Sequence, residues 1–322
     1  MSSGLIGSGW RVRRARIAVG ALVLLLAPLC ARAQAWTRGE HEVYVKVSYG
    51  SSTASEQYTF DGRRKEYADN VADDAFFDRS LYAYAEYGLA SNLTLNVSLP
   101  YKRLVVRDAA FRYRTFAFGT ATVGARYGLK RMVEALGDND ALAANISLSI
   151  PTGFTRNYLP SAGSGQVDAD LSVSYGRSLY PVPGYVQGGI GYRYRSDFYN
   201  LSTTIPCQEG VDKDCFADRR RSYGDEFLFG VEGGYTFGSW LFVNLMARSG
   251  WSLSAPDEGF SVSNPIPTRQ RYIKTGATLA LRPIEALGVS TQAFFTPYGR
   301  NTVNSFDLFI GVDYSFTIGG SE

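Results

Sequence analysis

Few residues of this 322-residue chain could take part in catalysis. The chain has one histidine, His41. His41 precedes the first strand-like segment, so a solvated residue at the rim of the fold explains it better than a general base does. The Asp73-Asp74 pair lies in a polar stretch, where solvated charge explains it. We therefore expect a protein that is not an enzyme.

Two cysteines, Cys207 and Cys215, stand in a short polar stretch in the second half of the chain. In an exported protein a disulfide between them is favoured, and it would stabilise that loop by roughly 2 to 3 kcal/mol on the chain-entropy model. A zinc site is the weaker alternative, because no histidine stands nearby and two ligands would be missing. The Gly188-Gly-Ile-Gly191 stretch lies inside a strand-like segment, so it is not a phosphate-binding loop and no cofactor is expected.

The first 35 residues have the three parts of an export signal. A stretch with four arginines precedes an apolar run over 17–29, and small-residue cleavage sites follow at Ala33 and Ala35. The apolar run is shorter than the roughly 20 residues that a membrane-spanning helix needs. We predict a signal peptide over residues 1–35, cut after Ala35 in preference to Ala33, and one barrel domain over 36–322.

Removing this signal changes the charge of the protein. The chain carries +3 in all, but five of its 33 basic residues and none of its 30 acidic residues lie in the first 35 positions. The remainder is close to neutral and has no long run of like charge. A nucleic-acid partner is therefore not expected.

Beyond residue 40, apolar residues recur with period two, which is the pattern of β-strands. In the first such segment Val43, Val45 and Val47 share one face, while Tyr44 and Lys46 share the other. The pattern predicts twelve strands, at 43–49, 81–89, 93–101, 121–129, 142–150, 167–175, 186–194, 227–237, 241–247, 273–281, 287–295 and 306–316.

The connections between these segments alternate in length. Those after odd-numbered segments are long, at 51–78, 102–118, 151–166, 196–223, 252–270 and 297–304, and those after even-numbered segments are short. Strands of about ten residues joined in this way are typical of bacterial outer-membrane barrels. The sequence thus predicts an all-β transmembrane antiparallel barrel of about 12 strands in the outer membrane, with short periplasmic turns and long extracellular loops.

Aromatic residues recur near the ends of the even-numbered segments, on the apolar face. An amphipathic ring at the membrane–water boundary buries its apolar part and keeps its hydroxyl wet. We predict an aromatic girdle formed by Tyr87, Tyr127, Tyr175, Tyr235, Tyr314 and Phe316. The general strand preference of tyrosine is the alternative, and it explains the frequency of the residue but not its position.

The opposite face of the strands carries charges of both signs, which are costly in a membrane unless they face water or each other. We predict that the lumen is lined by Lys46, Glu86, Arg126, Arg193, Arg195, Glu226, Glu232, Asn244, Arg248, Lys274, Gln292, Asp307 and Asp313. These residues either line a passage or form an ion-pair network that fills the barrel. Twelve strands lie between the filled barrels of about 8 strands and the open ones of about 16. Small inward residues such as Gly189 and Gly230 favour a passage, and the mixed charge predicts no strong ion selectivity.

The predicted location in the outer membrane implies several partners. The segment Phe309-Ile-Gly311-Val-Asp-Tyr314-Ser-Phe316 resembles the C-terminal assembly signal of outer-membrane proteins, which implies the barrel-assembly machinery. The Arg219-Arg220-Arg221 run is either a binding site for lipopolysaccharide phosphates or a solvated basic patch. Outer-membrane lipid, lipopolysaccharide and a small-molecule solute are the other expected partners, and the oligomeric state is left open.

Four stretches carry a resemblance to a known family: Ala35-Trp36, Tyr-Ala-Glu-Tyr-Gly-Leu-Ala-Ser-Asn-Leu-Thr-Leu at 84–95, Ser-Leu-Pro-Tyr at 98–101 and Ile-Pro-Thr-Gly at 150–153. The chain resembles the outer-membrane transporter-like family named for the meta-pathway of phenol degradation. This resemblance implies uptake of aromatic or other small hydrophobic compounds. No binding residue of that family can be assigned to a position in this chain.

Our hypothesis is a channel for passive or facilitated diffusion of small, aromatic or hydrophobic, molecules. The alternative is a closed structural or adhesive barrel that acts through its extracellular loops without transport. The chain is also similar in role to long-chain fatty-acid channels, which carry an N-terminal plug. Only residues 36–41 precede the first predicted strand here, so we expect no N-terminal hatch and any gate to come from loops such as 51–78.

Overall fold

The computed structural model describes residues 35–68, 75–133, 135–202, 215, 220–253 and 267–319. Their strands are β1 (Glu42–Tyr58), β2 (Arg64–Glu66), β3 (Phe76–Ala90), β4 (Leu93–Arg107), β5 (Arg112–Phe118), β6 (Thr120–Gly128), β7 (Asp140–Pro151), β8 (Asp168–Ser178), β9 (Gly184–Arg195), β10 (Glu226–Phe237), β11 (Leu241–Ser252), β12 (Arg271–Ile284), β13 (Leu287–Arg300) and β14 (Thr302–Thr317). A 3₁₀ turn, η1 (Lys130–Met132), lies between β6 and β7. No helix in this described part is long and apolar enough to cross a membrane.

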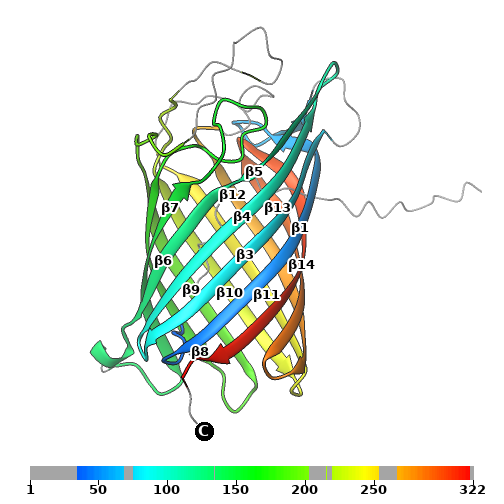
Figure 1. Cartoon of the computed structure of the whole chain (residues 1–322). Coiled ribbons are helices and arrows are strands. Elements are labelled where there is room, and N and C mark those ends of the chain that lie inside the picture. The colour runs from blue at the N-terminus through cyan, green and yellow to red at the C-terminus, as the bar shows by residue number, and fades with distance from the viewer. Residues whose placement is uncertain are drawn as a thin grey trace, which may run out of the picture.

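Twelve of these strands form one closed antiparallel barrel (Figure 1). Going round it, each strand pairs with its neighbours in the order β1, β3, β4, β6 and then β7 to β14. β14 pairs with β1, so the first and last strands close the sheet. Closure is required because an unpaired backbone group in hydrocarbon costs several kcal/mol. The predicted all-β barrel of about 12 strands is confirmed.

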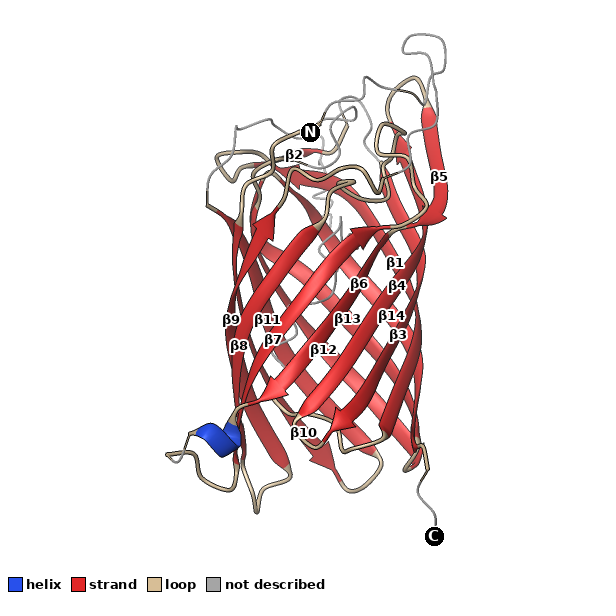
Figure 2. Cartoon of the chain, turned by 60° about the vertical axis from the view of Figure 1, so that its left-hand side comes forward, coloured by secondary structure: helices blue, strands red, loops and turns tan. Residues whose placement is uncertain are grey.

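The two remaining strands lie outside this ring. β2 pairs with the far end of β1, and β5 pairs with the end of β4, where Arg107 stands opposite Arg112. β4 and β5 form a hairpin that projects past the rim at the long-loop end (Figure 2). The prediction of a loop over 102–118 was therefore wrong, because strand pairing continues beyond the apolar belt, where arginines weaken the hydrophobic pattern.

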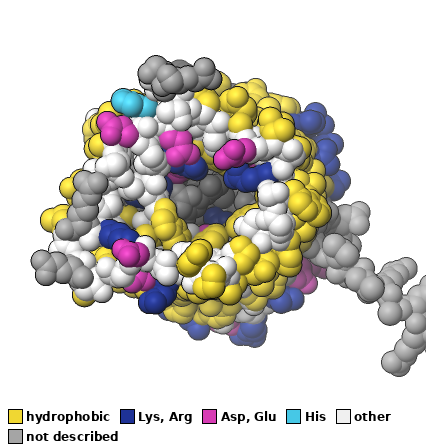
Figure 3. Space-filling model, turned by 90° about the horizontal axis from the view of Figure 1, so that it is seen from below, with side chains coloured by type: hydrophobic (Ala, Val, Ile, Leu, Met, Phe, Trp, Pro, Cys, Tyr) yellow, Lys and Arg dark blue, Asp and Glu magenta, His cyan; other side chains and the backbone are white. Residues whose placement is uncertain are grey.

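Side chains alternate between the outside and the inside of the barrel. On β1, Val47 is 58% exposed, whereas the neighbouring Lys46 is only 8% exposed. The apolar set lies on the outside, and the polar set faces the lumen. Figure 3, a view from the short-turn end, shows charged side chains around a central hollow and hydrophobic ones at the periphery. A closed barrel with an apolar exterior and a polar interior is the form of a protein of the bacterial outer membrane.

Three predictions fall on residues outside the described ones. The signal peptide occupies 1–35, of which only Ala35 is described, so it stays a prediction. Cys207 and Arg219 also lie outside the described residues. Cys215 is buried and forms a β-bridge with Tyr158, and its disulfide with Cys207 stays a prediction.

Barrel closure can be tested at Val312 in β14, which stands opposite Val47 of β1 and Val289 of β13. Val312→Pro removes a backbone donor inside the wall and should sharply reduce the fraction that refolds, as measured by heat-modifiable migration in gel electrophoresis. Phe60→Pro is the control. Phe60 is exposed at the first central position of a turn in which the Gly62 N–H donates to the Thr59 carbonyl, and proline suits that position. Normal folding of Val312→Pro would contradict the closure argument.

Candidate functional site

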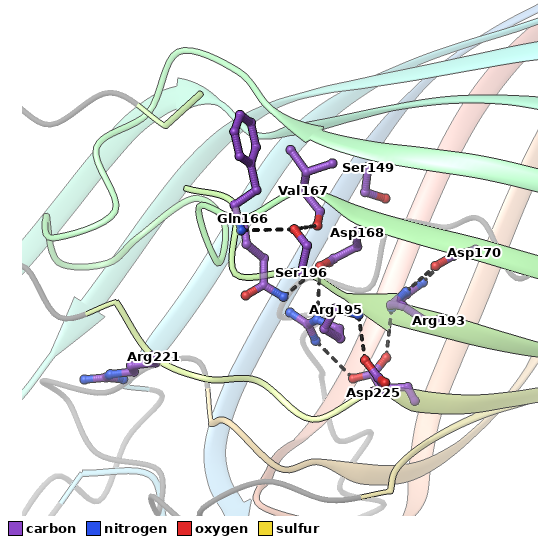
Figure 4. Close-up of polar contacts among 12 residues, drawn as sticks. Ser149, Gln166, Val167, Asp168, Asp170, Arg193, Arg195, Ser196, Arg221 and Asp225 are labelled. Carbon is purple, nitrogen blue, oxygen red and sulfur yellow. Dashed lines mark hydrogen bonds and ion pairs between the residues drawn. The ribbon is translucent and has the colours of Figure 1, made fainter. Parts of the chain in front are cut away.

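The densest group of charged residues on the inner wall joins β8, β9 and β10 (Figure 4). Arg193 donates from Nε to Asp170 Oδ1 at 2.7 Å and from Nη1 to Glu226 Oε2 at 3.0 Å. Arg195 donates from Nη1 to Glu226 Oε1 at 3.1 Å, and its Nε lies 3.3 Å from Asp168 Oδ1. Glu226 is therefore shared between the two arginines.

Strand register brings this group together. Asp170 stands opposite Arg193, and Asp168 stands opposite Arg195. Arg193 in turn stands opposite Glu226 on the next strand. Because alternate residues share one face of a strand, all five side chains point inward. Three carboxylates and two guanidinium groups stabilise one another only while every partner is present, so they act as a brace between strands.

The same group anchors the loops above it. The Gln166 side-chain amide donates to Asp168 Oδ1 at 2.7 Å, and the Tyr199 hydroxyl donates to Gln166 Oε1 at 3.0 Å. Asp225 Oδ1 accepts the backbone N–H of Arg195 at 2.8 Å. The loops that flank β8, β9 and β10 are thus held to the inner wall by the charged residues below them.

Two further ion pairs line the same half of the barrel. Lys274 Nζ lies 3.3 Å from Asp307 Oδ2, and the Ser52 hydroxyl donates to the other oxygen of that carboxylate at 2.7 Å. Lys102 Nζ lies 3.4 Å from Asp78 Oδ2. All of these residues are buried. Charge on the wall of the extracellular half is therefore arranged mainly as pairs between strands.

At the short-turn end, the segment that precedes β1 lies inside the barrel mouth. The backbone N–H of Ala35 donates to Gln187 Oε1 at 3.0 Å, and Arg126 Nη1 donates to the Trp36 carbonyl at 2.9 Å. Arg38 Nε donates to Glu86 Oε2 at 2.6 Å. The expectation of no N-terminal hatch was wrong: six residues are too few for a plug domain, but they are enough to cover one side of the mouth.

Glycines on two strands, Gly176 and Gly88, make room for this segment, and a third, Gly128, lies beside it. A Cβ at Gly176 would lie 2.5 Å from the Trp36 ring, and a Cβ at Gly88 would lie 1.8 Å from the Gly39 carbonyl oxygen. A Cβ at Gly128 would lie 3.4 Å from Thr37. Each of these glycines directly follows a predicted girdle tyrosine. The repeated Tyr-Gly pair was thus a sequence signal for the docked segment, and it was read only for its tyrosine.

The opposite side of this half of the lumen stays hollow. A cavity of about 180 Å³ lies against β10 to β14 and β1, and its walls include Lys46, Asn244, Arg248 and Asp313. The Arg248 guanidinium lies 4.5 Å from the centre of the Phe294 ring. The cavity thus presents charges of both signs beside aromatic surface.

A hydrogen-bonded chain separates this cavity from the docked segment. Asn244 donates to the Tyr185 hydroxyl at 3.1 Å, and that hydroxyl donates to Glu232 Oε1 at 2.7 Å. The Tyr185 ring packs edge-on against Trp36, with ring centroids 5.4 Å apart. Sequence reasoning missed Tyr185 and Trp36, because their roles depend on contacts between segments far apart in the chain.

An apolar core lies at the long-loop end. Phe154 and Ala162, from the connection between β7 and β8, pack with Phe76 of β3, Leu104 of β4 and Val303 of β14. Since β7 and β14 are five strands apart round the ring, this connection reaches across the mouth. Loops cross that end of the barrel in both Figure 1 and Figure 2. The extracellular end is therefore narrowed by packed apolar side chains.

None of the residues predicted for the lumen is exposed on the outside of the barrel. The buried ones are Lys46, Glu86, Arg126, Arg193, Glu226, Asn244, Lys274, Asp307 and Asp313, and the half-buried ones are Arg195, Glu232, Arg248 and Gln292. They fall into several clusters, because the N-terminal segment separates Glu86 and Arg126 from the cavity.

The predicted girdle residues lie toward the short-turn end. Exposed on the outer surface are Tyr127, Tyr175, Tyr235, Tyr314 and Phe316. Tyr87 is half-buried, and its hydroxyl lies 3.1 Å from Nδ1 of the exposed His41. Among the described residues, no group of three or more His, Cys, Asp or Glu side chains could hold a metal ion.

Comparison with known proteins finds similar structures but no similar sequence family. The sequence matches no protein-family model and no curated protein. The structure is similar to the COG4313 outer membrane channel from Pseudomonas putida F1, with a TM-score of 0.65 and 17% identity over 88% of this chain and 98% of that one. At this identity the likeness shows the fold, a closed outer-membrane β-barrel.

Other outer-membrane barrels are more distant. The NanC porin has a TM-score of 0.49 and 8% identity over 84% of this chain and 98% of that one. The CymD monoaromatic hydrocarbon channel has a TM-score of 0.41 and 7% identity over 87% of this chain and 89% of that one. At these identities the likeness concerns the fold, and the resemblance to the phenol meta-pathway family stays a prediction.

The brace can be tested at Arg193. Arg193→Met leaves Asp170 and Glu226 buried without their shared partner, which should lower the free energy of unfolding by roughly 3 to 5 kcal/mol. Urea unfolding in lipid vesicles measures it. The matched control is Arg177→Met, at an exposed arginine that lies 3.5 Å from Asp140 and should change stability by less than about 1 kcal/mol. Equal effects of the two substitutions would contradict the brace.

Proposed function

We propose that this protein is an outer-membrane channel for passive or facilitated diffusion of small, aromatic or hydrophobic, molecules. The observation that carries the proposal is the cavity of about 180 Å³ beside the docked N-terminal segment. For scale, an apolar cavity of about 150 Å³ holds benzene. A molecule with a single ring therefore fits the space, whereas a large sugar or peptide does not.

The chemistry of the cavity walls suits this class of molecule. Tyr44, Phe242 and Met246 offer aromatic and thioether surface, and Arg248 lies over the Phe294 ring. Asn244 and Asp313 supply polar groups. A hydroxylated or carboxylated aromatic molecule can place its ring against the first set and its polar group against the second.

Both ends of the barrel favour a narrow passage over a wide pore. The N-terminal segment covers one side of the short-turn mouth, and the apolar core around Phe154 narrows the opposite mouth. The overall likeness to the COG4313 outer membrane channel supports a channel. We infer that solutes pass through the part of each mouth that these two packed regions leave open.

The alternative function is a closed barrel that acts in adhesion or envelope structure through its extracellular loops. The observation that favours it is the same apolar core, because the connection that carries Phe154 shares this core with the strand ends that carry Phe76 and Leu104. Deleting residues 196–223 separates the two functions. An adhesive or structural role should be lost with this loop, whereas permeation should persist or increase.

Channel activity can be tested in planar bilayers and liposomes. Wild-type protein should give small single-channel steps and admit single-ring aromatic acids. Trp36→Ala combined with Arg38→Ala should release the N-terminal segment and raise conductance roughly twofold or more, because the segment covers part of the mouth. The control pair is Trp240→Ala with Arg177→Ala, two exposed residues of the same types at the same end. No conductance and no solute uptake in any variant would refute the channel.

Ion preference should depend on Arg248. Replacing it by glutamine removes a positive charge from the cavity wall and should shift the reversal potential in a salt gradient toward cations by several millivolts. Arg114→Gln, on the outer face of β5, removes the same charge outside the lumen and should leave the reversal potential unchanged. An equal shift in both variants would show that Arg248 does not line the conducting path.

A further inference from the structure

Five arginines gather on the outer surface of the barrel at its long-loop end. Arg79 belongs to β3, Arg103 and Arg107 to β4, and Arg112 and Arg114 to β5. Arg79, Arg103, Arg112 and Arg114 are exposed, and Arg107 is half-buried. We call these five residues the arginine face. They come from three adjacent strands and do not belong to the lumen described above.

Strand alternation fixes the direction in which the arginine face points. On β4, Lys102 reaches Asp78 inside the barrel, and Leu104 and Val106 belong to the apolar core. Arg103 and Arg107 alternate with these residues and therefore point outward. On β5, Arg112 stands opposite Arg107 and so shares its face.

The outward surface directly below the arginine face is apolar. Leu81, Tyr101 and Phe118 are exposed there, and the Tyr101 and Phe118 ring centroids lie 5.2 Å apart. Phe116 stands opposite Arg103, at the lower edge of the arginine face. Arg103 is two residues beyond Tyr101 along β4, a rise of about 7 Å. The change from aromatic to arginine marks the boundary between hydrocarbon and headgroups, so the guanidinium groups lie at headgroup level.

The arginine face concentrates positive charge. Within residues 101–118 the acidic residue is Asp108, whose Oδ1 accepts the backbone N–H groups of Ala110 and Phe111 at the hairpin tip. Neighbouring positive charges, that of Arg114 first, lower the pKa of Arg112 below its ordinary value. Such crowding is unfavourable unless an anion with several charges is bound.

We propose that the arginine face binds the phosphate groups of lipopolysaccharide in the surrounding outer leaflet. Guanidinium forks match phosphate oxygens bidentately, and arginine holds phosphate with more geometric specificity than lysine does. The acyl chains of the same lipid would lie on Leu81, Tyr101, Phe116 and Phe118. A phosphorylated glycolipid with several acyl chains supplies both parts at the required spacing.

The position of the arginine face distinguishes this ligand from a transported solute. It is continuous with the membrane-facing belt and lies on the opposite side of the wall from Lys102 and Asp78. It is also distinct from the Arg219-Arg220-Arg221 run. Because the site lies outside the lumen, the proposal does not depend on channel activity, and loss of one can be separated from loss of the other.

The test measures binding of bisphosphorylated lipid A to refolded protein in detergent, by native mass spectrometry and calorimetry. Arg103→Gln, Arg112→Gln and Arg114→Gln together should weaken binding about 10- to 100-fold. The same three positions changed to lysine should give an intermediate loss, since charge remains but the fork is gone. Dephosphorylated lipid A should bind the wild type as weakly as it binds the glutamine variant.

The matched control removes three exposed basic residues at the other end of the barrel: Lys130→Gln, Arg177→Gln and Arg282→Gln. It should bind lipid A like the wild type. Heat-modifiable migration checks that every variant is folded. Wild-type affinity in the glutamine variant at the arginine face, an equal loss in the control, or equal binding of dephosphorylated lipid A would overturn the proposal. Inorganic phosphate bound as tightly as lipid A would also overturn it, because the site would then not select a lipid.

Discussion

The need to pair every backbone group in hydrocarbon governs this structure. β1 and β14 satisfy it by closing the sheet, and closure gives each strand one face toward lipid and one toward the lumen. Within the hydrocarbon, the charged residues of the strands must therefore face the lumen. There they must pair or meet water, and the chain does both: Arg193 is enclosed by Asp170 and Glu226, whereas Arg248 borders a cavity.

The lumen is consequently divided into two regions. The wall from β3 to β9 carries the docked N-terminal segment, and the wall from β10 to β14 carries the cavity. A hydrogen-bonded chain through Tyr185 separates them. Both mouths are closed in part by non-polar packing, around Trp36 at one end and Phe154 at the other. Polar groups thus line the middle of the lumen, and apolar groups lie at its ends.

Much of the barrel could be predicted because period-two alternation is a local property of the chain. The alternation from Val43 to Val47 already shows which face of β1 meets lipid. In the same way, the positions of Asp170 and Arg193 in their strands place them on the face toward the lumen. The features that were missed depend on contacts between distant segments. The Arg38–Glu86 pair joins residues 48 apart, and Phe154 and Val303 belong to one apolar core although they lie far apart in the chain. β5 was missed because its outward positions carry arginines, which interrupt a hydrophobic pattern without interrupting strand pairing.

The contacts of the N-terminal segment also indicate when it can dock during folding of the barrel. Its partners are Tyr185 on β9, Arg126 on β6 and Glu86 on β3. Glu86 and Arg126 contact each other from strands two apart, whereas Tyr185 is six strands from β1 round the ring and comes within reach of Trp36 only when the sheet has curled. Docking of Trp36 on Tyr185 is therefore expected late in assembly, once the sheet has curled round the lumen.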